Sequence, residues 1–394
     1  MKRIPLYEYD RRNREKIVEV VEAENGLMLS AFRFGEQNGR IQLPTGTKYM
    51  LIDVSSLFAN EDRVTSLLPY LERIVAFVQN IDRCEACVIL ERQYMASAKG
   101  MLYFALGEVR SLEAKLGLTE LLSNNIADLS EKDFNDLCDT VNSRLFGNPE
   151  FKERLFEELR RFRVFSLMGN QRIFSAFLYG TSGIGKTETA RLIHHCLAPS
   201  EQLIKINFGN YSSANSLGSL IGSPRGYVGS SKGELSEKLL NSRGTVILID
   251  EFEKASKPIH NFFLQLLEDG WFTDSLGRDY DLNKYIIIFT SNLTEEKIDT
   301  ELAPEFRSRL NLISHFEPLT QKEKEAYVKF KAKEILSGVP EEKRASITPE
   351  LINGIIDFDV SDVEDLRKIN AELMKRISSS LYPIFYSEDG LDEE

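Results

Sequence analysis

The chain has 394 residues, 42% hydrophobic and 28% charged, the balance of a globular protein with room for two or three domains. It carries 61 acidic against 49 basic side chains, and a formal net charge of −12 gives it no overall attraction for nucleic acid or an anionic membrane. No stretch is apolar for long enough to span a membrane, and the N-terminal MKRIPLYEYDRRNREK lacks the apolar centre of a signal peptide. We therefore expect a cytoplasmic protein that binds neither a membrane nor nucleic acid.

The four cysteines are too few for a disulfide framework in a chain of this length. Cys84 and Cys87 form a C-x-x-C pair, which can be a redox pair or half of a zinc site. The remaining cysteines, Cys138 and Cys196, are distant in the sequence, and all four histidines follow residue 190. We therefore favour two small buried thiols over a metal site.

The N-terminal third of the sequence alternates strand and helix patterns. Residues 16–43 predict β structure, because Asn-Gly pairs at 25–26 and 38–39 separate short apolar runs, which is the strongest short hairpin signal. Further strands are expected at residues 49–54 and 86–90, and helices at 64–78 and 97–117. Together these elements predict a separate N-terminal mixed α/β domain over residues 1–140, in which we find no chemical motif.

The most informative stretch is FLYGTSGIGKT at residues 177–187. An apolar run expected as a strand leads into G-x-x-x-x-G-K-T, and a helix is predicted after it, so the context favours a phosphate loop over a glycine-rich turn that binds nothing. The backbone N–H groups of such a loop and the following helix N-terminus attract an anion. Lys186 is placed to reach the β- and γ-phosphates, and the Thr187 hydroxyl to bind Mg²⁺. The predicted phosphate-binding residues are Gly180, Thr181, Ser182, Gly183, Ile184, Gly185, Lys186, Thr187 and Glu188.

Three more apolar strands, expected at residues 203–208, 245–251 and 286–292, predict a parallel sheet covered on both faces. One strand ends in Asp250-Glu251 and another in Asn292. Beside a phosphate loop, Asp250 is placed to hold Mg²⁺ through water, Glu251 to polarise an attacking water and Asn292 to orient that water. Without the loop, the same residues would be read as ordinary strand ends and turn residues.

From about Thr320 the pattern becomes helical, with helices expected near 321–337, 349–357 and 362–380 and an acidic tail at the end. The pairs Thr320 with Glu323, and Ser361 with Glu364, both fit the capping box. Thr348 precedes a proline and fits a helix N-cap. We therefore expect a separate helical bundle over residues 319–394.

Over residues 144–320 the sequence resembles the AAA+ ATPases of the Clp family, the hexameric ring unfoldases and disaggregases. The resemblance rests on LIGSPRGYVG at 220–229, VILIDEFEKA at 246–255, FLQLLEDGWFTDSLGRDYDLNKYIIIFTSN at 263–292 and LAPEFRSRLN at 302–311. It implies an α/β fold with one AAA+ P-loop NTPase core on a parallel sheet at residues 141–318, followed by a C-terminal helical lid at 319–394.

The resemblance also implies roles for individual residues. Lys186 and Thr187 would bind phosphate and Mg²⁺, Asp250 would bind Mg²⁺, Glu251 would be the catalytic base and Asn292 the first sensor. ATP and Mg²⁺ are the implied ligands.

Arg309 matches the arginine finger that reaches the γ-phosphate held by a neighbouring subunit. Tyr227 and Val228, within Gly-Tyr-Val-Gly, match the pore loop that grips a threaded polypeptide. Apart from the family context, Arg309 would be read as a surface arginine and Tyr227 as an aromatic that pins a tight loop.

The lid departs from the family pattern. A Gly-Ala-Arg motif would place an arginine where this chain has Glu364, a carboxylate that would repel a triphosphate. We expect Glu364 to cap the last helix with Ser361, and Arg367, three residues later on the same helical face, to reach the nucleotide. Clp members that dock on a barrel peptidase usually carry an Ile/Leu-Gly-Phe/Leu tripeptide between the first sensor and the arginine finger. The stretch between Asn292 and Arg309 has no such tripeptide, so we expect no such partner.

The resulting hypothesis is an ATP-hydrolysing AAA+ protein-remodelling motor. It would act as a homo-oligomer, expected to be a hexamer, which threads polypeptide through its pore and contacts a protein substrate or partner through residues 1–140. The alternative is an ATP-dependent oligomeric switch or scaffold that presents the N-terminal domain to a partner without threading. A nucleic-acid motor is disfavoured by the acidic balance and by a pore loop that is aromatic rather than basic.

Overall fold

The computed structural model describes residues 4–36, 43–58, 68–95, 98, 106–118, 125–211, 216–223 and 233–386. Contacts within the chain divide it into two compact units. The first combines residues 1–124 with 215–243 and 271–281, and the second combines 125–214, 244–270 and 282–394. The second unit thus begins before the limit at residue 140 that the sequence suggested, and it holds both the phosphate loop and the helical bundle.

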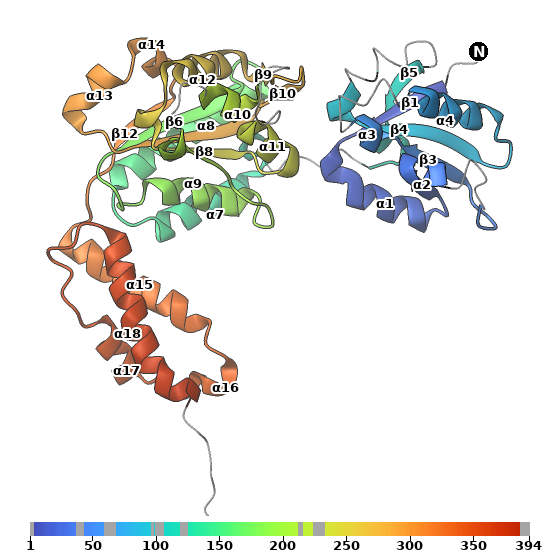
Figure 1. Ribbon diagram of the computed structural model, residues 1–394. Helices are drawn as coiled ribbons and strands as arrows, with labels where there is room; N and C mark the ends of the chain where they lie inside the picture. Colours follow the sequence, from blue (N-terminus) through green and yellow to red (C-terminus); the bar gives the residue numbers. More distant parts are fainter. Residues whose placement is uncertain are drawn as a thin grey trace, which may run out of the picture. The chain divides into compact units, whose positions relative to one another are not determined.

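The first unit is built on a five-stranded parallel sheet in the order β2-β3-β4-β1-β5 (Figure 1). One face packs against α2, α3 and α4, and the other against α1 and α6. The strands predicted at 49–54 and 86–90 are confirmed, as is the helix at 64–78 from residue 68 onward. The strands are β1 (Ile4–Tyr9), β2 (Leu27–Ser30), β3 (Tyr49–Asp53), β4 (Glu85–Glu91) and β5 (Leu106–Ser111), and the helices are α1 (Arg14–Ala23), α2 (Ala31–Glu36), α3 (Ser55–Phe58), α4 (Leu68–Asn80) and α6 (Leu112–Lys115).

The β structure predicted for residues 16–43 is confirmed at β2, but it is wrong at residues 16–23, where the chain forms helix α1, and at residues 31–36, which form helix α2. Ile17 and Val21, one helical turn apart, are buried against the sheet. Asn25 does adopt a positive φ of 59°, but it follows the end of α1 instead of turning a hairpin. The Gly26 N–H donates to the Val21 carbonyl at 2.7 Å, which closes the helix C-terminus. The second Asn-Gly pair, at 38–39, lies outside the described residues.

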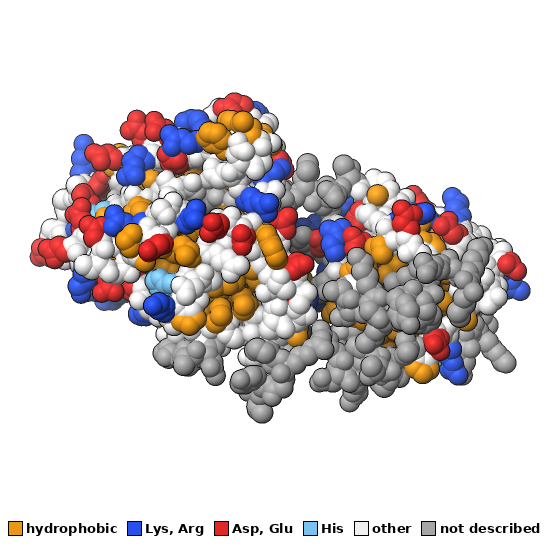
Figure 2. All heavy atoms as spheres, turned by 90° about the horizontal axis from the view of Figure 1, so that it is seen from above, with side chains coloured by type: hydrophobic (Ala, Val, Ile, Leu, Met, Phe, Trp, Pro, Cys, Tyr) orange, Lys and Arg blue, Asp and Glu red, His pale blue; other side chains and the backbone are white. Residues whose placement is uncertain are grey.

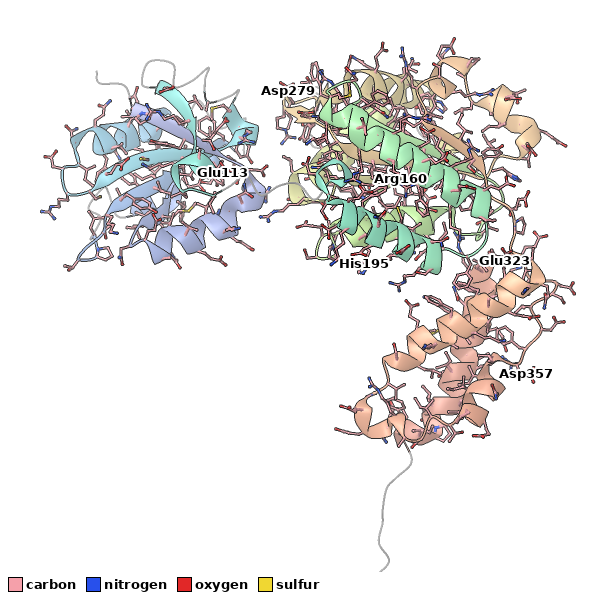
Figure 3. The ribbon with its side chains drawn as sticks, turned by 180° about the vertical axis from the view of Figure 1, so that it is seen from behind. Glu113, Arg160, His195, Asp279, Glu323 and Asp357 are labelled. Carbon is pink, nitrogen blue, oxygen red and sulfur yellow. The ribbon has the colours of Figure 1, made fainter. Side chains whose placement is uncertain are left out.

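The helix predicted at 97–117 is also wrong over most of its described part. Residues 106–111 form β5, which pairs in parallel with β1, and the helix α6 covers Leu112–Lys115 alone. Glu113 in α6 is buried and accepts hydrogen bonds from the Asp10 N–H at 2.7 Å and from Asn13 Nδ2 at 3.1 Å (Figure 3). These bonds hold the start of α6 against the segment that follows β1, an interior strand of the sheet.

The first unit also includes the helices α10 (Ser216–Ile221) and α11 (Glu234–Asn241) and a two-stranded antiparallel sheet of β9 (Trp271–Thr273) and β10 (Asp279–Asp281). The expected pore-loop residues Tyr227 and Val228 lie between α10 and α11, outside the described residues.

The second unit contains the parallel sheet that the sequence predicted, in the order β12-β6-β11-β8-β7. Every residue of β6 and β11 is buried, which explains their uninterrupted apolar sequences. The helices α7, α8 and α9 cover one face, and α12 and α14 cover the other (Figure 1). On this second face, phenylalanine rings of α12 and α14 pack against a phenylalanine of β11. The strands are β6 (Ile173–Tyr179), β7 (Ile204–Asn207), β8 (Val246–Asp250), β11 (Tyr285–Ser291) and β12 (Leu312–His315), and the helices are α7 (Glu131–Arg144), α8 (Pro149–Leu167), α9 (Lys186–Leu197), α12 (Lys257–Asp269), α13 (Glu295–Glu301) and α14 (Pro304–Arg307).

The helical bundle consists of α15 (Gln321–Ser337), α16 (Glu341–Arg344), α17 (Pro349–Ile356) and α18 (Leu366–Tyr386) around an apolar core. The capping box at the start of α15 is confirmed, because the Thr320 and Glu323 side chains each accept a hydrogen bond from the other's backbone N–H (Figure 3). Thr348 caps α17 as predicted, accepting the Leu351 N–H at 3.3 Å.

The capping box expected for Ser361 and Glu364 is wrong. Residues 361–362 form a turn, and α18 begins at Leu366. The cap is Asp365, whose Oδ1 accepts the Arg367 N–H at 2.8 Å. The helix starts late because Val360, buried in the bundle core, and Val363, packed against that core, require an irregular segment there.

The apolar character of the helices and the charges on the surface can be compared with the expectations from composition. Within the described ranges, no helix combines the length and apolar character needed to cross a bilayer. On the face drawn in Figure 2, acidic and basic side chains are interspersed over the described atoms.

The C-x-x-C pair holds one buried thiol, Cys87, and one partly exposed thiol, Cys84. A group of three or more His, Cys, Asp or Glu side chains able to hold a metal ion is not found among the described residues.

Candidate functional site

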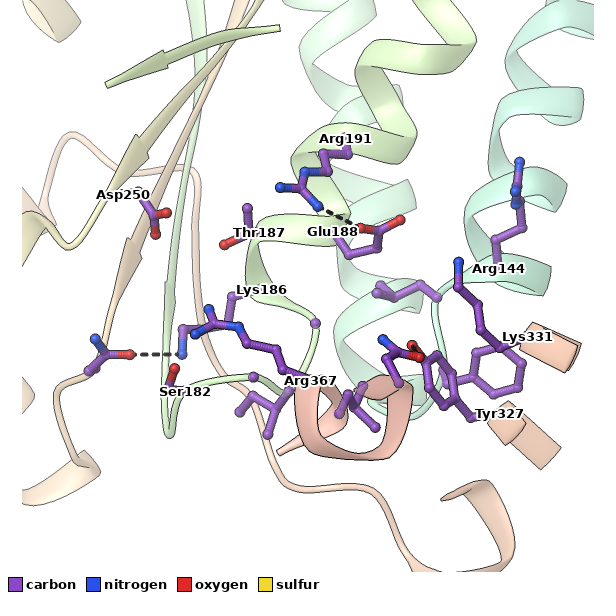
Figure 4. Close-up of a pocket in the computed structure, with 18 of the residues that line it drawn as sticks. Arg144, Ser182, Lys186, Thr187, Glu188, Arg191, Asp250, Tyr327, Lys331 and Arg367 are labelled. Atoms are coloured by element: carbon purple, nitrogen blue, oxygen red, sulfur yellow. Dashed lines mark hydrogen bonds and ion pairs between the residues drawn. The ribbon is translucent and has the colours of Figure 1, made fainter. Parts of the chain in front are cut away.

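A cavity of about 490 Å³ lies at the carboxyl ends of β7 and β8 and at the N-terminus of α9 (Figure 4). The phosphate loop, the two strand-end acids, the residue after β11 and the start of α18 all contribute to its lining, although they come from distant parts of the sequence. The predicted site residues that line it are Ser182, Gly183, Ile184, Gly185, Lys186, Thr187, Glu188, Asp250, Glu251, Asn292 and Arg367.

The glycines of the loop are required by its backbone. Gly180, Gly183 and Gly185 have φ values of 136°, 81° and 107°, a region that other residues rarely adopt. At Gly180 a Cβ atom would also lie 2.4 Å from the Phe316 carbonyl oxygen. Helix α9 starts directly after Gly185, so its first N–H groups, which have no partner within the helix, are available to an anion.

The Lys186 side chain is buried and points along the inside of the loop. Its Nζ donates to the carbonyls of Gly180 at 2.7 Å and Thr181 at 2.6 Å, and it lies 3.4 Å from Asn292 Oδ1. Burial lowers the pKa of Lys186 to about 8, although Glu253 and Asp250 act in the opposite direction. The ammonium is therefore a desolvated cation that a phosphate group would stabilise.

Asp250, at the end of β8, is held by two partners. Its Oδ1 accepts the Thr290 hydroxyl at 2.5 Å, and its Oδ2 forms an ion pair with Lys205 Nζ at 2.6 Å. Burial alone would raise the pKa of Asp250, but the bonds from Lys205 and Thr290 outweigh it and lower the pKa below its usual value. The Asp250 carboxylate and the Thr187 hydroxyl both line the cavity, and such oxygen ligands fit Mg²⁺.

Glu251 adopts a left-handed backbone conformation, with φ of 58° and ψ of 44°. The next residue, Phe252, is buried, and its ring lies 4.9 Å from that of Phe289 in β11. This packing holds a conformation that costs about 1–3 kcal/mol in a non-glycine residue. The Glu251 carboxylate pairs with Lys254 Nζ at 2.7 Å, and it lies so close to Gly209 that a Cβ there would be 2.2 Å from Oε2.

Asn292 links two charged side chains. Its Nδ2 donates to Glu253 Oε1 at 3.2 Å, while its Oδ1 faces the Lys186 ammonium. The amide is therefore oriented with its oxygen toward the phosphate loop.

The last helix of the bundle contacts the phosphate loop directly. The Leu366 N–H donates to the Gly183 carbonyl at 3.0 Å, and a Cβ on Gly183 would lie 1.9 Å from the Asp365 carboxylate. Arg367, in the first turn of α18, lines the cavity beside Ser182 and Lys186 (Figure 4). Glu364 is not among the described residues that line the cavity.

The sequence missed a group of residues at the other end of the cavity. The Phe146 ring lies 5.3 Å from the rings of both Tyr327 and Phe330, and Tyr327 Oη donates to Asn370 Oδ1 at 2.9 Å. Aromatic and apolar side chains of this kind suit a planar base. Their spacing in the sequence, such as Tyr327 and Phe330 one helical turn apart, is that of ordinary core residues. The missed lining residues are Arg144, Leu145, Phe146, Arg191, Lys205, Asn207, Tyr327, Phe330, Lys331, Glu334, Leu366 and Asn370.

Arg309 does not line this cavity among the described residues. It lies after α14 and pairs with Glu268 at 3.1 Å, with both side chains about half exposed.

Comparison with known proteins agrees with this arrangement. Residues 171–357 match the family model described as the AAA domain (Cdc48 subfamily). A ClpA homolog of Trieres chinensis, an ATP-dependent Clp protease ATP-binding subunit, is 30% identical over 284 residues, which cover 68% of this chain and 32% of the relative. The chaperone protein ClpB of Malacoplasma penetrans is 29% identical over 293 residues, covering 71% of this chain and 40% of the relative. The chain thus spans about a third to two fifths of the length of these relatives.

A solved structure of the S. cerevisiae Hsp104:casein complex in its extended conformation matches with a TM-score of 0.59 and 18% sequence identity. The match covers 98% of this chain and 90% of the other, and at this identity it supports the fold alone. Together with the family model and the Clp relatives, it confirms the resemblance and the fold class inferred from the sequence. The chain is a member of the Clp family of AAA+ proteins.

Proposed function

We propose that the protein is an ATP-hydrolysing, protein-remodelling motor of the Clp type. The observation that carries this proposal is the cavity in which Lys186 of the phosphate loop, Asp250, Glu251 and Asn292 meet at one edge of a parallel sheet. Phosphate-binding backbone, a pair of strand-end acids and an oriented amide are the parts that phosphoryl transfer to water requires.

In the proposed mechanism, the N-terminus of α9 and the Lys186 ammonium hold the phosphates. Phe146, Tyr327 and Phe330 supply the apolar end of the cavity for the base. Thr187 and Asp250 would hold Mg²⁺, which neutralises charge on the phosphate oxygens. Arg367 adds a positive charge from the lid, taking the place of the arginine that is missing at residue 364.

Glu251 is proposed as the general base. A carboxylate one residue beyond the Mg²⁺ ligand can accept a proton from water while that water attacks the γ-phosphorus of ATP; the bond from this phosphorus to the bridging oxygen breaks, and ADP leaves with that oxygen. The packing of Phe252 keeps Glu251 turned toward the cavity that it lines. Asn292, with its oxygen directed to the loop, would help to position the water.

Arg309 is proposed to act on the nucleotide of a neighbouring subunit. It is half exposed and apart from the cavity of its own chain, as a residue acting across an interface would be. A cation at the γ-phosphate stabilises charge that develops in the transition state. The active species is therefore a homo-oligomer, for which we propose a hexamer.

Tyr227 and Val228 are proposed to grip a polypeptide in the central pore, and residues 1–140 to contact a protein substrate or partner. A broad aromatic face binds an extended chain with little regard for its sequence. Without the docking tripeptide between Asn292 and Arg309, the motor would release its substrate whole instead of delivering it to a barrel peptidase.

Nucleotide affinity should depend on pH through Lys186. Its pKa of about 8 in the free protein rises when phosphate stabilises the ammonium, so binding takes up a proton at alkaline pH. The affinity for ADP should be constant below about pH 7 and should fall above pH 8, by up to about tenfold per pH unit. Calorimetry between pH 7 and 9.5 in two buffers measures both effects. Lys186→Arg, which does not titrate there, is the control, and a pH-independent wild-type affinity would refute this coupling.

Replacing the proposed base should separate binding from hydrolysis. Glu251→Gln keeps the phosphate and Mg²⁺ contacts, so it should bind ATP normally. Its rate of ATP hydrolysis should be lower than that of wild type by a factor of at least about 10². Lys186→Ala should instead lose ATP binding. Nucleotide titration and phosphate release measure the two properties, and wild-type turnover by the Gln variant would disprove the assignment of Glu251.

Mixing two inactive variants should restore activity if Arg309 acts between subunits. Arg309→Ala subunits keep the base and Glu251→Gln subunits keep the finger, so roughly a quarter of the sites in a random ring would be complete. The matched control is Arg307→Ala, which removes an arginine that pairs with Asp299 in the same chain and should leave ATPase activity unchanged. Full activity of a dilute monomer would contradict the model.

Tyr227 distinguishes a threading motor from an ATP-dependent switch. Tyr227→Ala should retain most ATPase activity and lose the unfolding of a substrate protein, whereas Tyr227→Phe should retain both. Unfolding of a fluorescent substrate and ATP turnover are measured together, with the exposed lid residue Tyr382→Ala as a control. If Tyr227→Ala unfolds the substrate at the wild-type rate, threading by this residue is excluded and the switch is favoured.

A further inference from the structure

Lys205 and Asp250 form an ion pair within the cavity. Lys205 is on β7, the edge strand of the sheet, where it lies opposite Leu248, while Asn207 lies opposite Asp250. The lysine side chain therefore extends along its neighbour strand β8 to the last residue of that strand, and its Nζ reaches Asp250 Oδ2 at 2.6 Å. Lys205 lines the same cavity as Lys186 and Thr187.

Each Asp250 oxygen has a partner of a different kind. Oδ1 accepts the hydroxyl of Thr290, a residue of β11 that is 1% exposed and fixed in the sheet. Oδ2 pairs with the Lys205 ammonium, which lies at the end of a flexible side chain that is 36% exposed. Thr290 can hold the carboxylate in place when Lys205 leaves, because the hydroxyl bond does not depend on the lysine.

The two lysines of the cavity, Lys186 and Lys205, differ in how firmly their side chains are held. Lys186 is 6% exposed and is anchored by two loop carbonyls, as expected of a fixed phosphate-binding group. Lys205 instead lies on the edge strand β7 with a long side chain that is partly exposed, so its ammonium can exchange Asp250 for another partner.

We propose that Lys205 is a tethered counter-cation that occupies the place of Mg²⁺ at Asp250 while the site is free of nucleotide, and that Mg²⁺ must displace it. This inference rests on the proposed function, since it assigns a second role to the Mg²⁺ residue of that site. The ammonium and Mg²⁺ compete for one carboxylate, so Lys205 sets the free Mg²⁺ concentration at which the nucleotide site fills. Once Mg²⁺ has displaced it from Asp250, the Lys205 ammonium would pair with phosphate oxygens of the bound nucleotide.

The test compares wild-type protein with Lys205→Met, which keeps the length of the side chain without its charge, and with Lys205→Arg, which keeps the charge. Binding of fluorescently labelled ADP is titrated over a series of free Mg²⁺ concentrations. Lys205→Met should reach half of its Mg²⁺-dependent binding at about two- to fivefold less Mg²⁺ than wild type, the size expected for losing a partly exposed ion pair. Lys205→Arg should remain close to wild type.

A second measurement uses Mg²⁺ alone and does not require nucleotide. Mg²⁺ should raise the melting temperature of Lys205→Met by more than that of wild type, and the gain should vanish in Lys205→Met combined with Asp250→Asn. Lys205→Gln replaces the Met variant if that one does not fold.

Equal half-saturating Mg²⁺ concentrations in wild type and the Met variant would overturn the inference, as would a higher concentration in the variant. A wild-type protein that binds no nucleotide at any Mg²⁺ concentration would instead overturn the proposed function. In that case the melting measurement with Mg²⁺ alone still decides whether Lys205 competes for Asp250.

Discussion

The desolvated ammonium of Lys186 is the constraint on which the site depends. A buried charge is costly unless it has partners, and here they are two loop carbonyls, the Asn292 amide oxygen and the nearby acids Glu253 and Asp250. The loop can wrap around the ammonium because its glycines adopt positive φ values, one of them against the Phe316 backbone. A buried ammonium of this kind favours a phosphate ligand, because the negative phosphate oxygens replace the hydration that the ammonium lost on burial.

The parallel sheet brings the other groups to that cation. The register pairs Ser291 with Tyr179 and Asn207 with Asp250, so neighbouring strands end at the same edge. The residues that follow or close these strands therefore converge, as is general for ligand sites of parallel sheets. The phenylalanine cluster beneath α12 and α14 then holds the turn after β8, where Glu251 has a left-handed backbone.

The lid is connected to the phosphate loop through backbone as well as side chains. The Leu366 N–H bonds to the Gly183 carbonyl, and Asp365, the cap of α18, packs on Gly183 where no Cβ would fit. These contacts join the loop to the first turn of α18, which also carries Arg367. In this chain, contact between the lid and the cavity therefore does not require an arginine at residue 364.

The sequence by itself determined the phosphate loop, every strand of the second sheet except β12, and the start of α15, because each has a local cause: glycines with a lysine at fixed spacing, uninterrupted apolar runs, and a capping box. It misjudged residues 16–24 because Asn-Gly supplies a positive φ that serves a helix end as well as a hairpin. Tertiary structure alone decided that residues 106–111 pair with β1, that Asp365 caps α18, and that Lys205 reaches Asp250. It also joined Phe146 to Tyr327 and Phe330 across more than half of the second unit's sequence. Such contacts depend on strand register and helix packing, which no local pattern of residues encodes.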